Sequence, residues 1–266
     1  MDQVDKITVV TVCYNAETLI AETMRSVCEQ DYPNVEYLVI DGKSGDGTVE
    51  IADKIRREYA SKDTLEIQIF SEPDYGIYDA MNKGIKLAKG KWIIFMNAGD
   101  LFYSSTVLSE VFCKQYAPEI SGVYGDTLRY HESWNLRVDG KPLEDIANGF
   151  PLPFCHQSVF VDTELMKKTM FDLRYKLAGD YNFFVQCYRM GCKLEHVPII
   201  VSRYAMGGVS ETNTVNHLKE KIAIREENSL EHFSRIKKKY LVARLSTRQQ
   251  IKRLLPARVI KMIRGF

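Results

Sequence analysis

The chain has 266 residues, of which 45% are hydrophobic and 27% are charged, and its formal net charge at pH 7 is +1. This length and balance predict one large domain, or one domain with an appendage, and exclude a disordered chain, a collagen-like repeat and a miniprotein scaffold. No apolar run approaches the roughly 20 residues that span a bilayer, and no signal-peptide pattern is present, so we expect a cytoplasmic protein.

The first hundred residues alternate between strand-like and helix-like patterns. Runs of β-branched or alternating apolar residues predict strands, and apolar residues at three- and four-residue spacing predict the helices between them. In chain order we expect strand 7–12, helix 17–30, strand 37–40, helix 48–59, strand 65–69, helix 76–89 and strand 92–96. This alternation is typical of an α/β fold with a parallel sheet and right-handed crossovers.

The pattern is weaker after residue 100. The expected elements there are helix 106–115, strand 122–124, a polar stretch up to residue 153, strand 158–161, helix 180–190 and strand 197–201. From about residue 215 the sequence is helical to its end, with an interruption at Pro256. The predicted organisation is therefore an α/β domain at residues 1–214 and a helical extension at residues 215–266.

The extension carries a strong positive charge. Residues 233–266 contain eleven Lys or Arg and no Asp or Glu, whereas the rest of the chain holds 25 basic and 35 acidic residues. Apolar residues recur near its end at helical spacing, with five basic residues between them: Ile251, Leu254, Leu255, Val259, Met262 and Ile263 alternate with Lys252, Arg253, Arg258, Lys261 and Arg264. This pattern is typical of a helix lying on an anionic membrane surface, although a helix packed on the domain or in a dimer interface has the same spacing.

Polar residues follow all four predicted N-terminal strands, at 13–15, 41–48, 71–76 and 97–100. Ligands of open parallel α/β sheets bind beyond the carboxyl ends of the strands, so these segments are where a site is expected. Neither a P-loop nor a G-x-G-x-x-G motif is present. A nucleotide surrounded by acids needs a divalent cation for its phosphates, and Asp100 is a candidate ligand for that cation.

These segments resemble the N-terminal half of a family 2 glycosyltransferase of the GT-A fold, in particular the bacterial enzymes that extend surface polysaccharides. The resemblance runs without a gap from about residue 7 to residue 100, and resumes at PFCHQSVF (153–160), LAGDYNFF (177–184) and GGVS (207–210). It implies a GT-A-type, mainly parallel sheet flanked by helices in residues 1–214, with the basic helical extension after it.

The resemblance also implies an activity. The reaction would be an inverting transfer of a hexose from a UDP-sugar donor, with Mn²⁺ or Mg²⁺ as cofactor. The implied acceptor is a hydroxyl of a lipid-diphosphate-linked oligosaccharide, in the assembly of O-antigen, capsule or exopolysaccharide. With the basic extension, this acceptor predicts a peripheral position on the inner face of the plasma membrane, on anionic lipid. No nucleic acid is expected as a partner.

Individual residues receive roles from the resemblance. It implies that the ring of Tyr14 stacks on uracil and that the carboxylate of Asp41 accepts the N3–H of the base, which suits both groups. It implies that Asp180 is the general base toward the acceptor hydroxyl, although aspartate is also a preferred helix N-cap. Other residues that match the donor side are Thr11, Asn15, Asp74, Asp79, Asn82, Lys83, Asn97 and Ala98, and those that match the acceptor side are His156 and Gln157.

The metal motif departs from the family pattern. The family usually shows D-x-D or D-D where this chain has Asn97-Ala98-Gly99-Asp100, so metal binding is carried over to Asp100 alone, with Asn97 as a source of a carbonyl oxygen. Further along the chain, Gly207, Gly208 and Ser210 suggest a flexible loop that closes over the diphosphate, and Arg203 is a candidate for a phosphate contact.

Two alternatives remain open from the sequence. A non-catalytic scaffold that binds a nucleotide sugar is consistent with the altered metal motif. A sugar nucleotidyltransferase has a related sheet, but it normally carries a glycine-rich loop with a basic residue after the first strand, and residues 11–16 contain neither.

Overall fold

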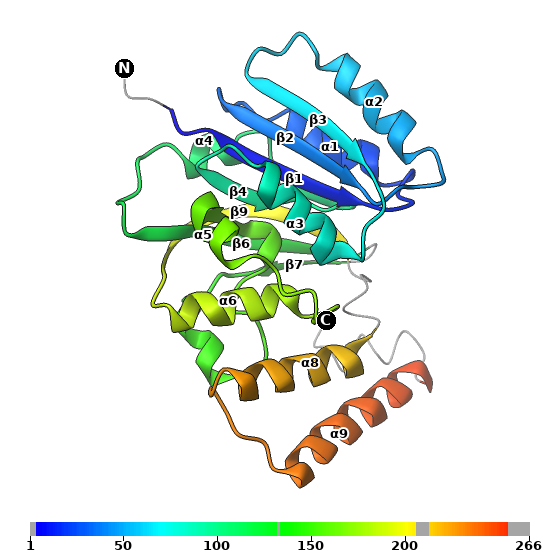
Figure 1. The fold of residues 1–266 in the computed structure, drawn as a ribbon, viewed down its shortest axis with the longest axis vertical. Helices are drawn as coiled ribbons and strands as arrows, with labels where there is room; N and C mark the ends of the chain where they lie inside the picture. Colours follow the sequence, from blue (N-terminus) through cyan, green and yellow to red (C-terminus); the bar gives the residue numbers. More distant parts are fainter. Residues whose placement is uncertain (1–3, 132–133, 206–212, 255–266) are drawn as a thin grey trace. The chain divides into compact units, whose positions relative to one another are not determined.

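The computed structural model describes residues 4–131, 134–205 and 213–254 of the chain (Figure 1). Its contacts divide the chain into two compact units, residues 1–206 and residues 207–266. The first unit contains the sheet, and the described part of the second contains two helices, α8 and α9, whose bounds are given below. Each unit is described by itself below.

The N-terminal half of the first unit is a parallel sheet. Its strands lie in the order β3-β2-β1-β4, with bounds β1 (Ile7–Cys13), β2 (Val35–Asp41), β3 (Leu65–Ser71) and β4 (Trp92–Phe95). The register aligns Cys13 with Asp41, and Asp41 with Ser71. The residues that follow these three strands therefore leave the sheet at one edge, as the sequence predicts.

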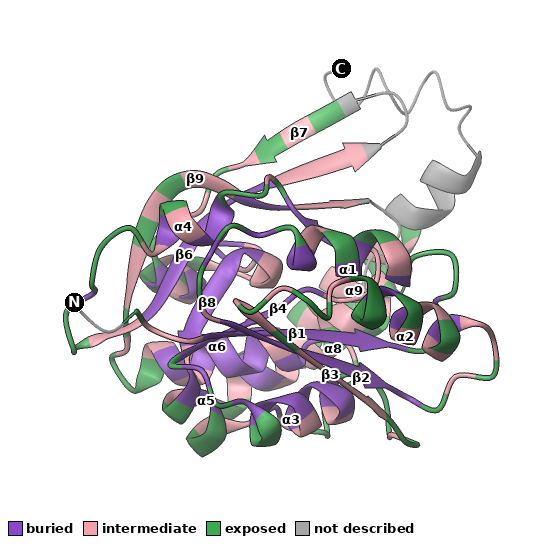
Figure 2. Ribbon diagram, turned by 90° about the horizontal axis from the view of Figure 1, so that it is seen from above, coloured by how far each residue is buried: buried purple, intermediate pink, exposed green. Residues whose placement is uncertain are grey.

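Helices cover both faces of these strands (Figure 1). One face packs against α1 (Ile20–Cys28), α2 (Thr48–Glu58) and the short α4 (Val107–Val111), and the other against α3 (Ile77–Leu87). Side chains of a strand alternate between its faces, so Val9 lies in the core beneath α1 while Val10 faces Gly84 of α3. Buried residues fill the central strands, whereas β3 at the edge is half-exposed (Figure 2).

The C-terminal half of the sheet is mixed. Beyond β4 the strand order is β8-β6-β9-β5, and β7 pairs with β6. The bounds are β5 (Asp100–Phe102), β6 (Ile120–His131), β7 (Trp134–Val138), β8 (Val159–Asp162) and β9 (Lys193–Ala205). Because β8 runs antiparallel to β4, the start of β8 lies beside the end of β4. The segment before β8 is thereby brought to the edge where the parallel strands end.

Besides the 3₁₀ turn η2 (His156–Ser158), four described elements of this half were missed by the sequence analysis. They are β5, β7, the 3₁₀ helix η1 (Leu143–Asn148) and the helix α5 (Thr163–Thr169). All are short, and β5 and β7 form by pairing with β9 and β6, so their own residues show little periodicity. Two predicted elements near the site are confirmed: the helix α6 (Gly179–Arg189) and β8, which is preceded by the 3₁₀ turn η2 (His156–Ser158).

The second unit contains α8 (Thr214–Glu227) and α9 (Arg235–Leu254). Two ion pairs join the start of α9 to the segment before it: Lys238 Nζ lies 2.7 Å from Glu226 Oε2, and Lys237 Nζ lies 2.6 Å from Glu231 Oε1. Within the described residues, no helix is both long and apolar enough to cross a membrane. The apolar positions predicted from Leu255 to Ile263 lie outside the described residues, so the amphipathic character of that segment stays a prediction.

Candidate active site

Asn15 joins the loops that follow β1 and β2. Its backbone N–H donates to Ser44 Oγ at 2.8 Å, and its side-chain Oδ1 accepts from the N–H of Gly45 at 2.9 Å. Asn15 has φ 48°, a left-handed conformation that asparagine tolerates better than most residues. The predicted donor-side residue Asn15 therefore stabilises the loop after β2 by hydrogen bonds. Its neighbour Tyr14 is 66% exposed at the sheet edge.

Tyr14 and Asp74 meet over Gly42. A Cβ atom added to Gly42 would lie 2.4 Å from Asp74 Oδ2 and 3.3 Å from Cδ2 of the Tyr14 ring. The turn after β3 fixes Asp74, because its Oδ1 accepts from the N–H of Gly76 at 2.8 Å. An exposed ring and a carboxylate thus lie side by side at one strand edge, an arrangement that suits a nucleobase and a sugar hydroxyl.

The carboxylate of Asp41 is buried and already hydrogen-bonded within the protein. Its Oδ2 accepts from Ser71 Oγ at 2.6 Å and from the N–H of Ser44 at 3.0 Å, and its Oδ1 accepts from the Ser44 hydroxyl. Asp41 therefore holds the ends of β2 and β3 together with the following loop. The contact between the Asp41 carboxylate and the base stays a prediction.

Two predicted donor-side residues lie in the interior instead. Thr11 is fully buried within β1, where its hydroxyl contacts Tyr37 Oη at 2.9 Å and donates to the carbonyl oxygen of Met96 at 2.7 Å. Asn82 is buried on α3, and its amide forms two hydrogen bonds with the backbone of Phe171, at 2.8 and 2.9 Å. Their side-chain polar groups join strands and segments within the protein, and their predicted contacts with the donor stay predictions.

The remaining donor-side residues lie on or near α3 and β4. Asp79 Oδ2 accepts from the N–H of Tyr75 at 3.0 Å, and Lys83 Nζ pairs with Glu72 Oε1 at 2.9 Å. Ala98 donates its backbone N–H to Val12 at 3.2 Å, which continues the sheet beyond β4. Arg203 pairs with Glu22 of α1, with Nη2 at 3.2 Å from Oε1. The loop at Gly207, Gly208 and Ser210 lies outside the described residues.

A second cluster surrounds Asp180 in the first turn of α6. Tyr78 of α3 donates its hydroxyl to Asp180 Oδ1 at 3.1 Å, and His156 Nδ1 lies 3.3 Å from Asp180 Oδ2. Burial opposes the charged imidazolium, but the carboxylates of Asp180 and Asp100 outweigh it and raise the pKa of His156 above its ordinary value. The predicted base and the predicted acceptor-side histidine are therefore direct partners.

Asp100, at the start of β5, completes this cluster. Burial raises the pKa of its carboxyl to about 6, against the opposing effects of the nearby His156 and of a hydrogen bond from the Gln157 side chain. The structure thus brings Asp100, His156, Gln157 and Asp180 together from three separate segments. Topology explains why: η2 precedes β8, and the start of β8 lies beside the end of β4.

The residues around Asp100 fit a divalent cation in part. Asn97 and Asp100 share a tight turn, in which the N–H of Asp100 donates to the carbonyl of Asn97 at 2.8 Å. The side-chain Oδ1 of Asn97 is buried without a hydrogen-bond partner, and burial disfavours the charge of Asp100. A hard cation would satisfy both oxygens. Among the described residues no group of three or more His, Cys, Asp or Glu has metal-binding geometry, so further ligands would come from the diphosphate and water.

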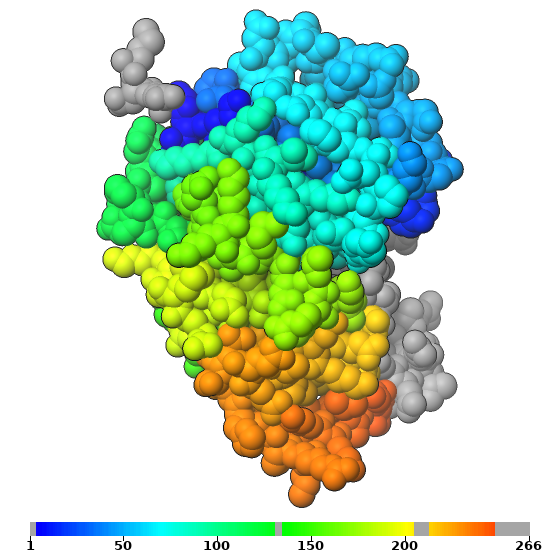
Figure 3. All heavy atoms as spheres, in the orientation of Figure 1, coloured from blue at the N-terminus to red at the C-terminus, as the bar shows by residue number. Residues whose placement is uncertain are grey.

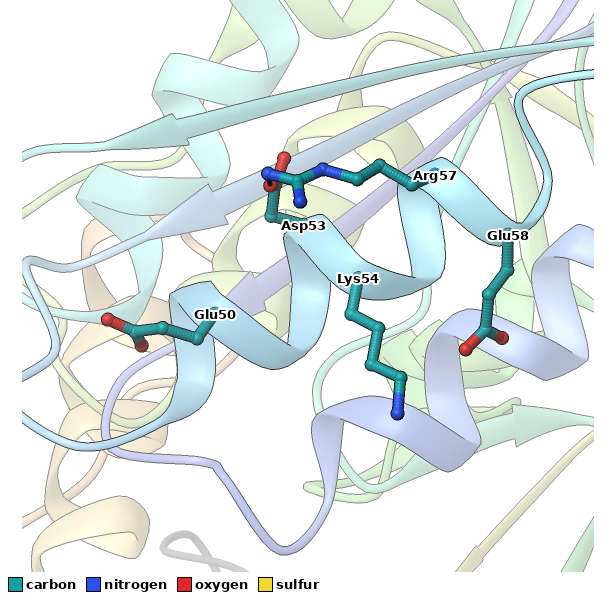
Figure 4. A pocket seen from close by; sticks show the side chains of 5 residues that line it. All are labelled: Glu50, Asp53, Lys54, Arg57 and Glu58. Atoms are coloured by element: carbon teal, nitrogen blue, oxygen red, sulfur yellow. Dashed lines mark hydrogen bonds and ion pairs between the residues drawn. The ribbon is translucent and has the colours of Figure 1, made fainter.

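A separate hollow lies along α2 and is lined only by charged side chains, those of Glu50, Asp53, Lys54, Arg57 and Glu58 (Figure 4). Asp53 pairs with Arg57, and Glu58 pairs with Arg25 of α1 at 2.8 Å. Exposed ion pairs of this kind contribute little to stability, and these side chains do not belong to the strand exits. We assign no function to this hollow.

On another face of the first unit, α3 and α5 lie side by side (Figure 3). Aromatic rings pack against Tyr78 of α3: its ring centroid lies 5.3 Å from that of Phe171, which in turn lies 5.6 Å from that of Phe95. The face of α3 that carries Tyr78 is therefore packed into the core, with its hydroxyl directed at Asp180.

The mostly parallel sheet flanked by helices has the GT-A fold of nucleotide-sugar-dependent transferases. The segments that follow its parallel strands carry acidic residues, at positions where other α/β proteins have phosphate-binding glycine loops. The chain belongs to glycosyl transferase family 2, whose sequence pattern matches residues 8–191. Membership of this family makes it a nucleotide-sugar-dependent glycosyltransferase.

Similar proteins agree with this assignment. A PGL/p-HBAD biosynthesis glycosyltransferase of Mycobacterium tuberculosis is 29% identical over 204 residues, which cover 74% of this chain and 76% of that protein. Among solved structures, a mannosyltransferase of Pyrobaculum calidifontis in complex with GDP-Man and Mn²⁺ has a TM-score of 0.65 at 20% identity, over 91% of this chain and 69% of that one. The 1–349 fragment of S. aureus TarS in complex with UDP has a TM-score of 0.61 at 18% identity, over 82% of this chain and 65% of the fragment. The two structural likenesses show the fold alone.

Sequence reasoning missed several residues of the site. In the sequence, Tyr78 is one of the apolar positions of an amphipathic helix. Its contact with Asp180 could not be predicted, because the two residues are 102 positions apart in the chain. Ser44 and Ser71, which hold Asp41, lie in segments that the sequence marked as polar strand exits, but nothing in their spacing indicates a shared partner. The Asp41-Gly42 dipeptide could have indicated a close approach of other residues to Gly42, since glycine is favoured where chains approach closely.

Proposed function

We propose that this enzyme moves a hexose from a UDP-sugar to a hydroxyl of a growing, lipid-diphosphate-linked oligosaccharide with inversion, in the assembly of a bacterial surface polysaccharide. The observation that carries the proposal is the convergence of Asp180, His156 and Asp100 at the edge where the parallel strands end. The Tyr14–Gly42–Asp74 cluster at the exits of β1, β2 and β3 would hold the nucleotide.

The proposed chemistry follows from the two carboxylates. Asp180 removes the proton from the acceptor hydroxyl as its oxygen attacks the anomeric carbon, and the bond from that carbon to the UDP oxygen breaks on the opposite side. Tyr78 and His156 hold the carboxylate that receives the proton. Asp100 and Asn97 would hold Mn²⁺ or Mg²⁺, which when bound neutralises the charge that develops on the departing diphosphate.

The nucleotide part is tested by binding of UDP, GDP and dTDP in the presence of Mn²⁺, with two glycine variants of one loop. Gly42→Ala places a Cβ against Asp74 and Tyr14, whereas Gly45→Ala meets no atom within 4 Å. We expect UDP to bind most tightly to the wild type, and Gly42→Ala to weaken it about tenfold, which corresponds to about 1.4 kcal/mol. Gly45→Ala should bind UDP like the wild type.

Titration calorimetry measures these affinities directly. Tighter binding of GDP than of UDP would refute the choice of uridine. Equal losses in the two glycine variants would refute the placement of the nucleotide over Gly42.

The membrane part of the proposal rests on the charge of the extension. Each basic residue near anionic lipid contributes about 1 kcal/mol, so five of them suffice to localise a protein. We expect the full chain to co-sediment with vesicles containing phosphatidylglycerol, but not with pure phosphatidylcholine vesicles. Replacing the five basic residues of 252–264 by Gln should strongly weaken this binding.

The matched control for this experiment is the double substitution of Lys237 and Lys238 by Gln. Both lysines pair with glutamates in the second unit, so they are less available to lipid. Equal sedimentation with both lipids, or equal losses in the two variants, would show that the distal basic residues do not bind an anionic surface.

A further inference from the structure

The carboxylate of Asp180 receives hydrogen bonds on both of its oxygens from different segments. Tyr78 Oη of α3 lies 3.1 Å from Oδ1, and His156 Nδ1 of η2 lies 3.3 Å from Oδ2. The N–H of Tyr181 also donates to Oδ1, at 2.8 Å. Donors that approach both oxygens restrict rotation of the carboxylate about its terminal bond.

The position of the Tyr78 ring is fixed from several sides. A Cβ on Gly179, the residue before the base, would lie 2.8 Å from ring atoms of Tyr78, so this contact requires glycine. The ring packs on Phe171, and Phe171 is tied by its backbone to Asn82, one turn further along α3. The phenol is therefore positioned by the core and not by the carboxylate alone.

The phenol is also a dependable donor. Burial in the first place, and the adjacent Asp180 carboxylate in the second, raise the pKa of Tyr78 well above its ordinary value. The hydroxyl thus keeps its proton at neutral pH and donates a hydrogen bond to Asp180.

We infer that Tyr78 is a positioning residue for the transfer reaction: its buried hydroxyl holds the Asp180 carboxylate in the orientation that accepts the proton of the attacking hydroxyl. The inference rests on the proposed role of Asp180 as the base. Tyr78 lies on α3, the helix that also carries predicted donor-side residues. Through Tyr78, this helix would also orient the base on the acceptor side of the site.

A correctly oriented base matters because reacting groups must be placed within a fraction of an ångström. A misplacement of about 1 Å costs about 100-fold in rate. Tyr78→Phe removes only the hydroxyl and keeps the ring against Gly179 and Phe171. Since the hydroxyl does not contact the Tyr14–Gly42–Asp74 cluster in the structure, its loss should change turnover and leave donor affinity as it was.

The test compares Tyr78→Phe with Tyr32→Phe. Tyr32 is also buried, and its hydroxyl donates to the carbonyl oxygen of Asp5 at 2.9 Å, so both variants lose one buried hydroxyl. The probes are UDP-glucose, UDP-galactose and UDP-N-acetylglucosamine with Mn²⁺, read as released UDP. We expect Tyr78→Phe to lower kcat by 10- to 100-fold with KM for the donor within twofold, and Tyr32→Phe to keep both values within twofold.

Crystal structures of the two variants give a readout that does not depend on turnover. In Tyr78→Phe the Asp180 carboxylate should be rotated or present in two conformers, whereas in Tyr32→Phe it should stay in place. An Asp180 that is unmoved in Tyr78→Phe overturns the inference, as does an unchanged kcat. Gly179→Ala, which displaces the ring by its Cβ, provides a second variant and should also lower kcat.

Failure of the proposed function gives a different result. If Asp180→Asn retains full turnover, Asp180 is not the base and the proposed mechanism fails. If Asp180→Asn is inactive while Tyr78→Phe behaves like Tyr32→Phe, the mechanism stands and only the role of Tyr78 is refuted. If none of the three donors is cleaved by the wild type, the crystal structures alone decide the role of Tyr78.

Discussion

Replacing Asp180 by Asn is expected to lower turnover of the sugar donor by about 10³-fold, within the range that general-base catalysis contributes. Asparagine has nearly the same shape, and its side-chain oxygen still accepts a hydrogen bond from one of the neighbours Tyr78 and His156. What it lacks is the ability to take up a proton at neutral pH. UDP affinity should therefore stay within twofold of the wild-type value, because the nucleotide cluster over Gly42 is unchanged.

The matched control is Asp172→Asn. This acid precedes α6 by a few residues, and its carboxylate pairs with Arg174, with Oδ2 at 2.7 Å from Nη2. It carries the same change of charge without a place in the site, so turnover should stay near the wild-type value. Single-turnover kinetics and calorimetric titration of UDP separate the two effects. Retained turnover in Asp180→Asn would mean that another group removes the proton.

Replacing Asp100 by Asn is expected to lower metal-dependent turnover by about 10²-fold or more and to weaken the apparent affinity for Mn²⁺. The reason is that Asp100 is the sole carboxylate of the Asn97–Asp100 turn, and a neutral amide is a poor ligand for a hard cation. In the wild type, chelation of the metal by EDTA should have an effect of similar size. In Asp100→Asn, EDTA should add little.

A pH dependence accompanies this prediction. Burial raises the pKa of Asp100 to about 6, so in the metal-free protein the carboxyl binds a proton as the pH falls through about 6. The proton competes with the cation, and the apparent Mn²⁺ affinity should decrease below that pH and level off above it. In Asp100→Asn this dependence should disappear.

Asn97→Asp provides the opposite variant. It places a carboxylate where the buried Oδ1 of Asn97 has no hydrogen-bond partner. We expect it to bind Mn²⁺ about tenfold more tightly than the wild type, because added ligand charge raises the affinity for a divalent cation. Electron paramagnetic resonance of Mn²⁺ measures the affinity in all three proteins. Equal affinities would place the cation elsewhere.

Much of the N-terminal half could be predicted from its sequence, because its information is local. Apolar runs between polar exits gave the strands, and the stripes on α1 and α3 gave their helices. The C-terminal half was predicted less well. The short strands β5 and β7 depend on partners far away in the chain, and the polar stretch before Pro153 contains β7 and η1, which local patterns do not distinguish from loops.

The sequence by itself determined the chemistry that is present at the strand ends. It identified the acids, the aromatic residue Tyr14 and the motifs around His156 and Asp180, because these depend only on residue type and order. The tertiary structure decided which of these groups meet. It buries Thr11 within β1, where its hydroxyl donates to Met96, and it joins the side chain of Asn82 to the backbone of Phe171. It also places Tyr78 beside the proposed base Asp180, 102 residues away in the chain. Such contacts arise from packing between distant segments, and the local periodicity of the sequence does not predict them.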